Sequence, residues 1–528
     1  MHAAPIDSKT PETGPTIAWW KMLNRYQWLI FAFAAMGWMF DTMDQQLFTA
    51  SRSLAMKSLL PDRSMEIQTQ YGSWATSLFI IGWASGGLIF GVMGDKWGRV
   101  KTMGVTILMY SLFTGLSALA KTFSVFALGR FLTGFGVGGE FAVGAALVAE
   151  VMPDKARPHA LGMLQALSAV GNLTAAKLLG WVAPHFGWQG LYYIGTLPAI
   201  VGLLVFWRLR EPEKFMAAKA AAKARTSGAL EMGRMKDLFA IPRWRRNTLV
   251  GLALAIAGVV GLWGAGFWSP ELIDSTLPTL SLENREQMAK VLAAPADQQA
   301  QVLQGLTPAA QKKFIEFRKR DLNPGQKMAE DQLASSPLTG VETERMQSLL
   351  KKAMPENEKT RLKSDALVLQ QLGAFVGLYG FGWVSARIGR RKTFLIALLM
   401  GWMSILLAFG TFQDRSQIWY LWPILGFGAL GVFGGYAIYL PELFPTRLRS
   451  TGTGFCYNVG RFIAALGPLT LGQLGLMLSG RFALPGFRIA AMIVGTSYLL
   501  GVVALIWAPE TLNQPLPEDE AVETAELV

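Results

Sequence analysis

Long apolar stretches of roughly 20 residues, about a dozen in all, divide this chain, and a helix needs about that length to cross a bilayer core. Of its 528 residues, 52% are hydrophobic and only 16% are charged. An ordinary soluble domain has about 25% charged residues. A soluble protein with a large apolar core does not contain so many uncharged runs of this length. We therefore predict an all-α polytopic membrane protein with twelve transmembrane helices.

The expected spans define two six-helix bundles. The twelve spans are expected at 28–50, 71–93, 102–120, 123–151, 159–183, 190–208, 248–270, 366–386, 394–412, 418–440, 451–477 and 486–508. The domains that follow are an N-terminal tail (1–27), an N-terminal six-helix bundle (28–208), a basic linker (209–247), a C-terminal six-helix bundle (248–508) that includes an insert (271–364), and an acidic tail (509–528).

The two halves repeat one another in sequence. Gly134-Phe135-Gly136 recurs 292 residues later as Gly426-Phe427-Gly428. The same offset relates the set Glu150, Pro153 and Arg157 to the set Glu442, Pro445 and Arg449. Gly98-Arg99 recurs as Gly389-Arg390, with an offset of 291. Chance does not produce this register across two separate loops. Two related bundles with a site between them are a recurrent transporter design.

Basic residues set the expected orientation. Eleven Lys and Arg residues lie between Arg208 and Arg246, and further bases fall in alternate loops. The positive-inside rule places those loops in the cytoplasm, together with both termini. We expect an integral protein of the plasma (bacterial inner) membrane. The polar segment Met1–Arg25 is not followed by a short apolar core and a cleavage site, so no cleaved signal peptide is expected.

Residues 271–364 break the repeat, because the matching loop of the first half spans only 51–70. The segment carries 14 Lys/Arg and 13 Asp/Glu, with helical stretches at Arg285–Ala293 and Thr307–Asp321. We predict a helical extracytoplasmic insert between spans seven and eight. A functional lid and a flexible decoration are both open interpretations of it.

Several chemistries lack a sequence signal. The single cysteine, Cys456, excludes an intramolecular disulfide. His2, His159 and His185 have no neighbouring ligand at metal-binding spacing, so no metal site is expected. No phosphate-binding G-x-x-x-x-G-K-[ST] loop occurs. We expect neither an enzyme nor a bound cofactor, and the net charge of +13 reflects the loops and not a nucleic-acid partner.

The loop between spans two and three reads Gly91-Val-Met-Gly-Asp95-Lys-Trp-Gly98-Arg99-Val100-Lys101, and a degenerate copy stands at Ala386–Lys392. These segments resemble the signature loop of the major facilitator superfamily. Val100 stands where that motif usually has a base. Arg130-x-x-x-Gly134-x-x-x-Gly138 in span four is similar to a second superfamily motif. The resemblance covers nearly the whole chain outside the insert and implies a two-bundle transporter.

The segments Pro441–Arg449 and Pro509-Glu510-Thr511 look like the sugar-porter and metabolite:proton symporter branch of that family. Phe40-Asp41-Thr42-Met43-Asp44 is similar to the paired-aspartate motif of aromatic-acid and nicotinate-type symporters. The glutamine pair that is typical of sugar porters is missing from span seven, which makes sugar uptake less favoured.

Ionisable residues inside the membrane indicate function, because each costs several kcal/mol to insert. Asp41 and Asp44 share one helix face, and repulsion between two carboxylates favours a proton carrier. Asp41 is expected past the midplane, facing the outer cavity. Glu140 is the third proton-coupling candidate. The alternative for Asp41 and Asp44 is a helix cap or a structural pair.

Arg461 lies near mid-membrane and is the preferred anchor for an organic anion, because a guanidinium grips a carboxylate with two parallel hydrogen bonds. An Arg held by a neighbouring carboxylate or by carbonyls is the alternative. Arg130 and Glu140 map by the offset onto Trp422 and Val432, so neither charge is repeated. Two roles would explain charges that occur in one half only: a functional site, or a buried ion pair that packs one bundle. The substrate-binding candidates are Arg461, Arg130, Lys177, Asn458 and Gln370; Lys177 also has the option of reaching the interface.

Paired charges at the inner helix ends form an expected cytoplasmic gate, which the family resemblance implies breaks during turnover. Its candidate residues are Asp95, Arg99, Glu150, Arg157, Arg390, Glu442 and Arg449.

The combined prediction is a monomeric secondary active transporter, a proton-coupled symporter that imports a small organic anion such as an aromatic or other monocarboxylate. Its expected partners are that anion, protons and the lipid bilayer. A sugar or polyol transporter, an efflux antiporter of the same fold, and a transporter-like receptor that uses the insert are the alternatives.

Overall fold

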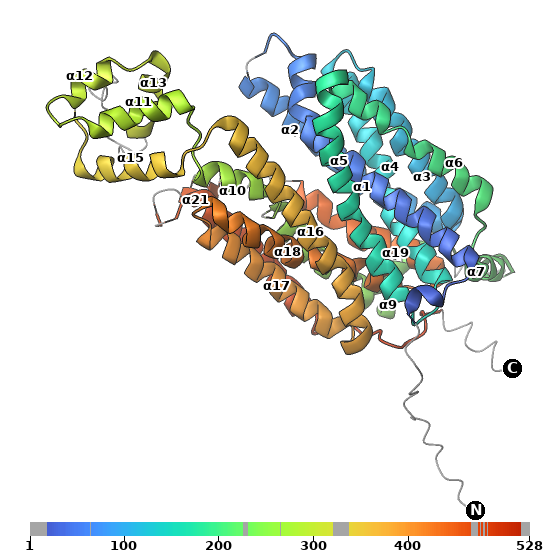
Figure 1. Ribbon diagram of the computed structural model, residues 1–528. Coiled ribbons are helices and arrows are strands. Elements are labelled where there is room, and N and C mark those ends of the chain that lie inside the picture. The colour runs from blue at the N-terminus through green and yellow to red at the C-terminus, as the bar shows by residue number, and fades with distance from the viewer. Residues whose placement is uncertain are drawn as a thin grey trace, which may run out of the picture.

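The structure is a computed structural model that describes residues 18–518 apart from 64, 225–230, 265, 320–336, 466–473, 476, 479–480 and 483. Six predicted segments therefore lie partly outside the described residues: the N-terminal tail, the basic linker, the span at 248–270, the insert, the span at 451–477 and the acidic tail. The described elements are helices, arranged as two bundles side by side (Figure 1).

The N-terminal bundle is built from six consecutive helices. They are α1 (Arg25–Leu59), α2 (Met65–Lys96), α3 (Arg99–Ala118), α4 (Phe123–Val151), α5 (Arg157–Ile194) and α6 (Pro198–Arg208). Asn24 caps α1, since its side chain accepts from the backbone N–H of Gln27 while the Gln27 side chain accepts from that of Asn24. Gly187, with φ of 65°, breaks α5 between the two expected spans at 159–183 and 190–208.

The C-terminal bundle repeats this order with one interruption. Its helices are α9 (Pro242–Gly264), η3 (Gly266–Trp268), α10 (Ser269–Thr276), α16 (Glu356–Ile388), α17 (Arg390–Thr411), α18 (Ile418–Glu442), α19 (Arg449–Ala464), α21 (Gly486–Gly495) and α22 (Ser497–Ala504). Arg488 donates to the carbonyls of Phe409 and Phe412, and thereby holds the end of α17 against α21.

Eight helices of the described chain are long and apolar enough to cross a membrane. The first part of α5, together with α1, α3 and α19, completes the twelve, and these four are richer in polar residues. The fold is therefore the expected all-α membrane architecture of two six-helix bundles. The helices that meet across the interface between bundles are α2, α4 and α5 on one side and α16, α18 and α19 on the other.

Small residues set how closely the helices pack. A side chain at Gly134 of α4 would clash with the carbonyl of Phe79 in α2, and one at Gly426 of α18 would clash with that of Gln370 in α16. These two contacts are related by the repeat. Small residues permit such close approach between membrane helices, so the repeated Gly-Phe-Gly segments have the same packing role in both halves.

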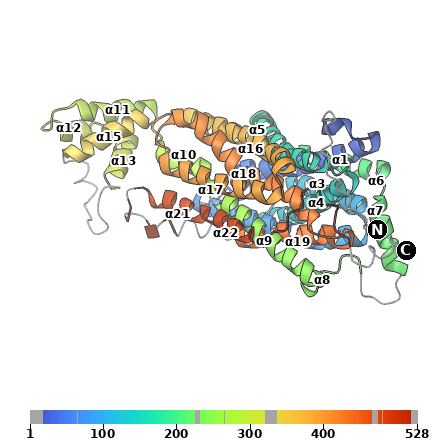
Figure 2. The same cartoon turned by 90° about the horizontal axis from the view of Figure 1, so that it is seen from below.

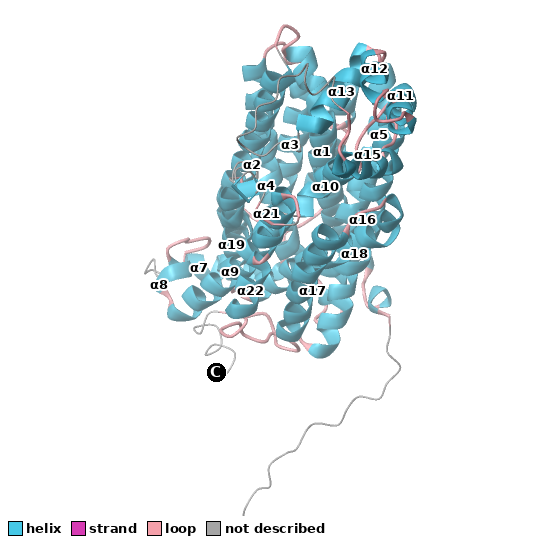
Figure 3. Cartoon of the chain, turned by 90° about the vertical axis from the view of Figure 1, so that its left-hand side faces the viewer, coloured by secondary structure: helices cyan, strands magenta, loops and turns pink. Residues whose placement is uncertain are grey.

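Two helical segments lie outside the bundles, at opposite ends. The linker helices α7 (Glu213–Ala224) and α8 (Asp237–Ala240) lie near the first and last described residues, at what we call the terminus end (Figures 1 and 3). The helices of the insert lie at the other end, called here the insert end, and both views in Figures 1 and 2 separate them from α7. They are α11 (Leu282–Ala293), α12 (Gln299–Gln304), α13 (Pro308–Lys319) and α15 (Gly340–Lys352).

The insert has a hydrophobic core of its own. Met288, Val291, Leu303, Phe314 and Met346 are buried together and form a cluster separate from the core of the bundles. The insert is joined to the C-terminal bundle near the start of α16. There the Asp274 carboxylate pairs with Lys359 at 3.0 Å and with Lys363 at 2.6 Å.

Arg318 and Glu342 tie α13 to α15 within the insert. Both guanidinium donors Nε and Nη2 bond to the Glu342 carboxylate, at 2.8 and 3.0 Å. Burial acts to raise the pKa of Glu342, but the hydrogen bonds from Arg318 and Thr339 outweigh it and hold that pKa below its usual value. The ionised form is thus the one that the folded insert stabilises.

We expect Glu342→Gln to destabilise the insert by roughly 1–2 kcal/mol, because the amide keeps the helix cap but loses the charge-assisted bonds. Hydrogen exchange of the full-length protein should become faster in α11, α13 and α15 and stay unchanged in α1–α6. Since the folded pKa is depressed, this stabilisation is present above the ordinary glutamate pKa and is lost as pH falls through the folded value. Equal exchange rates in both proteins would contradict the assignment.

Candidate functional site

A cavity of about 220 Å³ lies between the two bundles. Its walls come from α1, α2 and α5 on one side and from α9, α10, α16, α18 and α19 on the other. On α1 the lining residues follow helical spacing, which turns a single face of that helix to the cavity. The residues that carry the argument below are Trp38, Thr42, Gln45, Gln46, Thr49, Trp83, Gln165, Asn172, Trp263, Gln370, Gln371, Tyr457 and Arg461.

Arg461 is the single charged side chain among the described residues that line the cavity. Its guanidinium lies 4.2 Å from the ring centres of both Trp83 and Tyr457. Nη1 donates to the Tyr457 carbonyl at 2.7 Å and to Asn458 Oδ1 at 3.0 Å, whereas Nε is buried without a partner in the described chain. The side chain is therefore held in place with donor capacity left over.

Amide side chains line the rest of the cavity. Asn172 of α5 donates to Gln371 of α16 at 3.1 Å, which makes a hydrogen bond from one bundle to the other. Gln370 accepts a 3.0 Å bond from Ser269, at the start of α10. These groups both donate and accept without carrying charge, so the cavity combines one fixed cation with a neutral polar wall.

A buried ion pair stands inside the N-terminal bundle, beside the cavity but not on its surface. Arg130 Nη1 lies 3.7 Å from Asp44 Oδ2, and both side chains are buried. Thr114 donates to Asp44 at 2.7 Å, and Arg130 Nη2 donates to Thr133 and to Ser117, each at 3.0 Å. Arg130, predicted as a substrate ligand, thus has a carboxylate partner of its own, and the structure does not place it in the cavity.

Asp41 and Glu140 are two further buried carboxyl groups of this bundle. Asp41 is fully buried, and neither carboxyl oxygen has a hydrogen-bond partner among the described residues. Its electrostatic neighbours are Glu140, Asp44 and Arg461. Glu140 accepts from Thr106 at 2.9 Å and presses against Gly37 of α1.

The sequence predicted that Asp41 faces the outer cavity. In the structure the Asp41 side chain is fully buried and does not line the cavity. The cavity stripe on α1 includes Trp38, Thr42 and Gln45. Asp41 falls beside that stripe, on the side turned toward α4. Helix rotation, which spacing alone does not fix, decides this difference.

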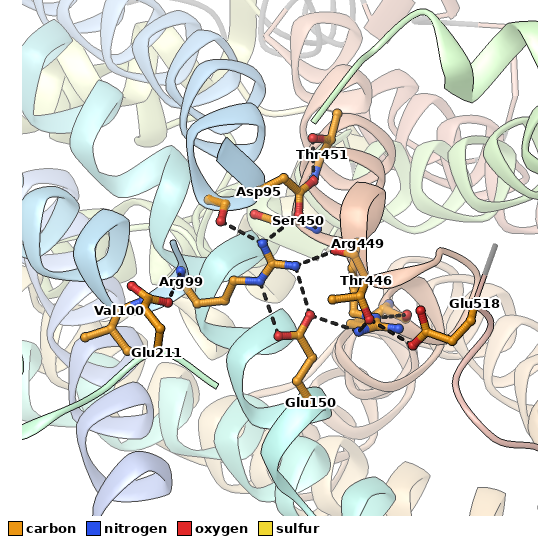
Figure 4. A network of polar contacts seen from close by, with 12 residues as sticks. Asp95, Arg99, Val100, Glu150, Glu211, Thr446, Arg449, Ser450, Thr451 and Glu518 are labelled. Carbon is orange, nitrogen blue, oxygen red and sulfur yellow. Dashed lines mark hydrogen bonds and ion pairs between the residues drawn. The ribbon is translucent and has the colours of Figure 1, made fainter. Parts of the chain in front are cut away.

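At the terminus end a buried charge network joins the bundles (Figure 4). Arg99 pairs with Asp95 at 2.8 Å and with Glu150 at 2.9 Å. Glu150 also pairs with Arg449 of the other bundle at 2.8 Å. The Asp95 carboxylate accepts from the backbone N–H groups of Ser450 and Thr451, at 3.1 and 2.7 Å, and so caps the first turn of α19.

The second half repeats only part of this network. Arg390 pairs with Glu442 at 2.8 Å inside the C-terminal bundle. Arg157 bonds to Asp154 and to the Ala149 carbonyl, without an ion pair to the C-terminal bundle among the described residues. The carboxylates of Glu211 and Glu510 cap the first turns of α3 and α17 in matching positions. Neither cap was singled out from the sequence, although Pro509-Glu510-Thr511 was noted as a motif.

The three remaining predicted substrate ligands, Gln370, Asn458 and Lys177, differ in their position relative to the cavity. Gln370 lines the cavity as a candidate ligand should, whereas Asn458 accepts from Arg461 and donates to the Gly454 carbonyl, and so positions the arginine. Lys177 is exposed and is not part of the lining.

Sequence reasoning missed Asn172 and Gln371, because neutral amides in an apolar helix carry no charge signal. In the described chain no cluster of three His, Cys, Asp or Glu residues suits a metal ion.

Comparisons with known proteins agree with this geometry. The model of the Major Facilitator Superfamily matches residues 28–293 and 361–526. The cis,cis-muconate transport protein of Acinetobacter baylyi is 26% identical over 93% of this chain and 97% of its own length. The niacin transporter of the same organism is 24% identical, over 89% and 94%. A solved proton:xylose symporter, 15% identical, has a TM-score of 0.61 over 94% of this chain and 99% of that one, which shows the fold.

We expect Asp95→Asn to open the terminus end, because the neutral amide loses both the Arg99 pair and its charged interaction with the first turn of α19. Spin labels at Trp97→Cys and Ile388→Cys, in a Cys456→Ala background, should report a longer distance by electron paramagnetic resonance. Lys101→Gln, which removes an exposed base from the first turn of the next helix, α3, is the control. An unchanged distance in Asp95→Asn would refute a latch at this carboxylate.

Proposed function

The chain belongs to the major facilitator superfamily, and we propose that it is a proton-coupled symporter that imports a small organic anion. A secondary transporter of this design needs a central site between two bundles and a closure on one side of it. The cavity at Arg461 supplies the first, and the buried network at Asp95 supplies the second.

Arg461 is the observation that carries the proposal. A buried cation whose Nε has no partner favours a ligand that brings a carboxylate, because the pair would satisfy both groups with two parallel bonds. Trp83 and Tyr457 both pack against the guanidinium, while its Nε donor has no partner among the described residues. A neutral sugar would leave the arginine without a counter-charge, which costs free energy in a buried site.

The relatives support the same chemistry. Two of them are named for cis,cis-muconate and niacin, which are both carboxylates. They match this chain along nearly its whole length, so the Arg461 region lies within the shared part.

Asp41 is the proposed proton carrier. A buried carboxylate without hydrogen bonds is costly in its charged form, so this conformation favours protonated Asp41. Once deprotonated, Asp41 would become a competing anion for Arg461, which is one of its electrostatic neighbours. Protonation of Asp41 thus frees Arg461 for the substrate, and one side chain couples the two ligands.

The end at which the cavity is closed is compatible with import. The cavity lining continues from Arg461 toward the insert end, as far as Thr49 and Ser364. The terminus end is sealed by Asp95, Arg99 and Glu150, which are buried. The linker's bases favour a cytoplasmic terminus end in the bacterial inner membrane, so the described conformation would accept substrate from outside.

We expect Arg461→Ala to reduce proteoliposome uptake of a transported carboxylate by about a hundredfold, since it loses two charge-assisted bonds. Arg461→Lys should recover little of this, because an ammonium lacks the planar pair of donors. Lys177→Gln, which removes an exposed cation outside the lining, should leave uptake unchanged. Normal uptake by Arg461→Ala would eliminate the anchor and favour a neutral substrate or an efflux role.

Asp41→Asn should separate exchange from coupling. The amide mimics the protonated carboxyl but cannot release a proton, so exchange of labelled for unlabelled carboxylate across the membrane should continue. Accumulation driven by an inward proton gradient should fall to the level without a gradient. Gradient-driven accumulation at the wild-type level would assign the proton to another group, with Glu140 the next to test.

A further inference from the structure

Hydrogen-bonding groups of different kinds line the cavity at different depths, which the proposed function does not by itself require. Its indole and guanidinium donors without partners gather at one depth, and its neutral amides lie nearer the insert end, apart from Gln165, which is eight residues after the start of α5. Arg461 is twelve residues after Arg449, the first residue of α19, and so lies about 18 Å from the terminus end at 1.5 Å per residue. Trp38 and Trp83, counted along α1 and α2 from the same end, lie at about 20 Å.

These three side chains present donors only. The indole Nε1 atoms of Trp38 and Trp83 and the Nε atom of Arg461 are buried without partners in the described chain. Indole and guanidinium nitrogens donate hydrogen bonds and do not accept them. A ligand end that reaches this depth must therefore be rich in acceptors, as a carboxylate is.

The amide level lies nearer the insert end. Gln371 is seventeen residues before Ile388, the last residue of α16, and so lies about 26 Å from the terminus end. Gln45, twenty residues after Arg25, lies at about 30 Å. The two levels are thus about 8–12 Å apart. Amides there offer both donors and acceptors, and no described lining residue at that depth is charged.

Aromatic side chains connect the two levels. Trp263 packs edge-on to Trp83, with ring centres 6.2 Å apart, and Tyr457 faces the guanidinium. Trp263 is twenty-one residues after the start of α9, which places it close to the amide level. A flat or compact apolar body would fill this stretch, because stacking on such rings favours it.

We propose that the site selects a monoanion: one carboxylate on Arg461 and the two indoles, and an uncharged hydrogen-bonding group, such as a hydroxyl or a carboxamide, at the amide level. This inference rests on the proposed function and narrows its substrate class. A second carboxylate at the far end would be buried without a cation, and sites built for neutral polar groups reject such a ligand strongly. The relative named for muconate, a dicarboxylate, would then differ from this chain in that part of its site.

The test compares three ligands that share one ring and one carboxylate: benzoate, 4-hydroxybenzoate and 4-carboxybenzoate. Their binding to the purified full-length protein is measured by calorimetry at pH 7, where both carboxylates of the last are ionised. We expect 4-hydroxybenzoate to bind about tenfold more tightly than benzoate and about a hundredfold more tightly than 4-carboxybenzoate. Equal affinity for 4-hydroxybenzoate and 4-carboxybenzoate would overturn the inference and leave the anion symporter standing. Binding of none of the three would refute the proposed function itself.

A single substitution should reverse the preference for a monoanion over a dianion. Gln371→Lys places a cation at the amide level and should raise affinity for 4-carboxybenzoate at least tenfold, while affinity for 4-hydroxybenzoate falls. Gln413→Lys adds the same charge at an exposed position in the loop after α17 and serves as the control. If both variants change the two affinities alike, the selectivity does not arise at the amide level and the inference fails.

Discussion

The closure at the terminus end depends on an unusual hydrogen bond between bundles, in which a side chain of one caps a helix of the other. The Asp95 carboxylate, at the end of α2, accepts from the first backbone N–H groups of α19. Glu150 then bridges Arg99 and Arg449 across the same boundary. Asp95 and Glu150 keep their pairs with Arg99 inside the N-terminal bundle, but the Arg449 pair and the bonds to α19 exist only while the bundles touch. These contacts hold the bundles together at the terminus end, so the cavity opens toward the insert end.

This latch makes two related halves functionally different. Offset by 291 residues, the position equivalent to Asp95 is Ala386, so the second half has no carboxylate to cap α5. Arg390 and Glu442 repeat the pair of Arg99 and Glu150 but remain inside one bundle. The buried acids beside the cavity are also confined to the first half. One bundle thus carries the charges proposed to move protons, and the other provides the arginine proposed to hold the substrate.

The sequence predicts the scaffold well, because apolar length and repeat register are local properties. The Gly134 and Gly426 contacts are an example, since an offset between identical motifs became the same helix contact in both halves. The site is predicted less completely. Arg461 was found because a mid-membrane charge stands out, whereas Asn172 and Gln371 are ordinary amides whose meeting across the cavity is a tertiary fact. Asp41 was found as a residue but assigned the wrong face, because spacing gives the relation between α1 side chains and not the rotation of α1 against α4.

The central claim is that one carboxylate and a proton cross the membrane together. Proteoliposomes that contain a pH-sensitive dye, with no gradient imposed at the start, test it directly. Adding a transported carboxylate outside should acidify the lumen at a rate that follows uptake of the label, and Asp41→Asn should abolish the acidification. Uptake of the label without any change in luminal pH would contradict the coupling and leave a uniporter of the same fold.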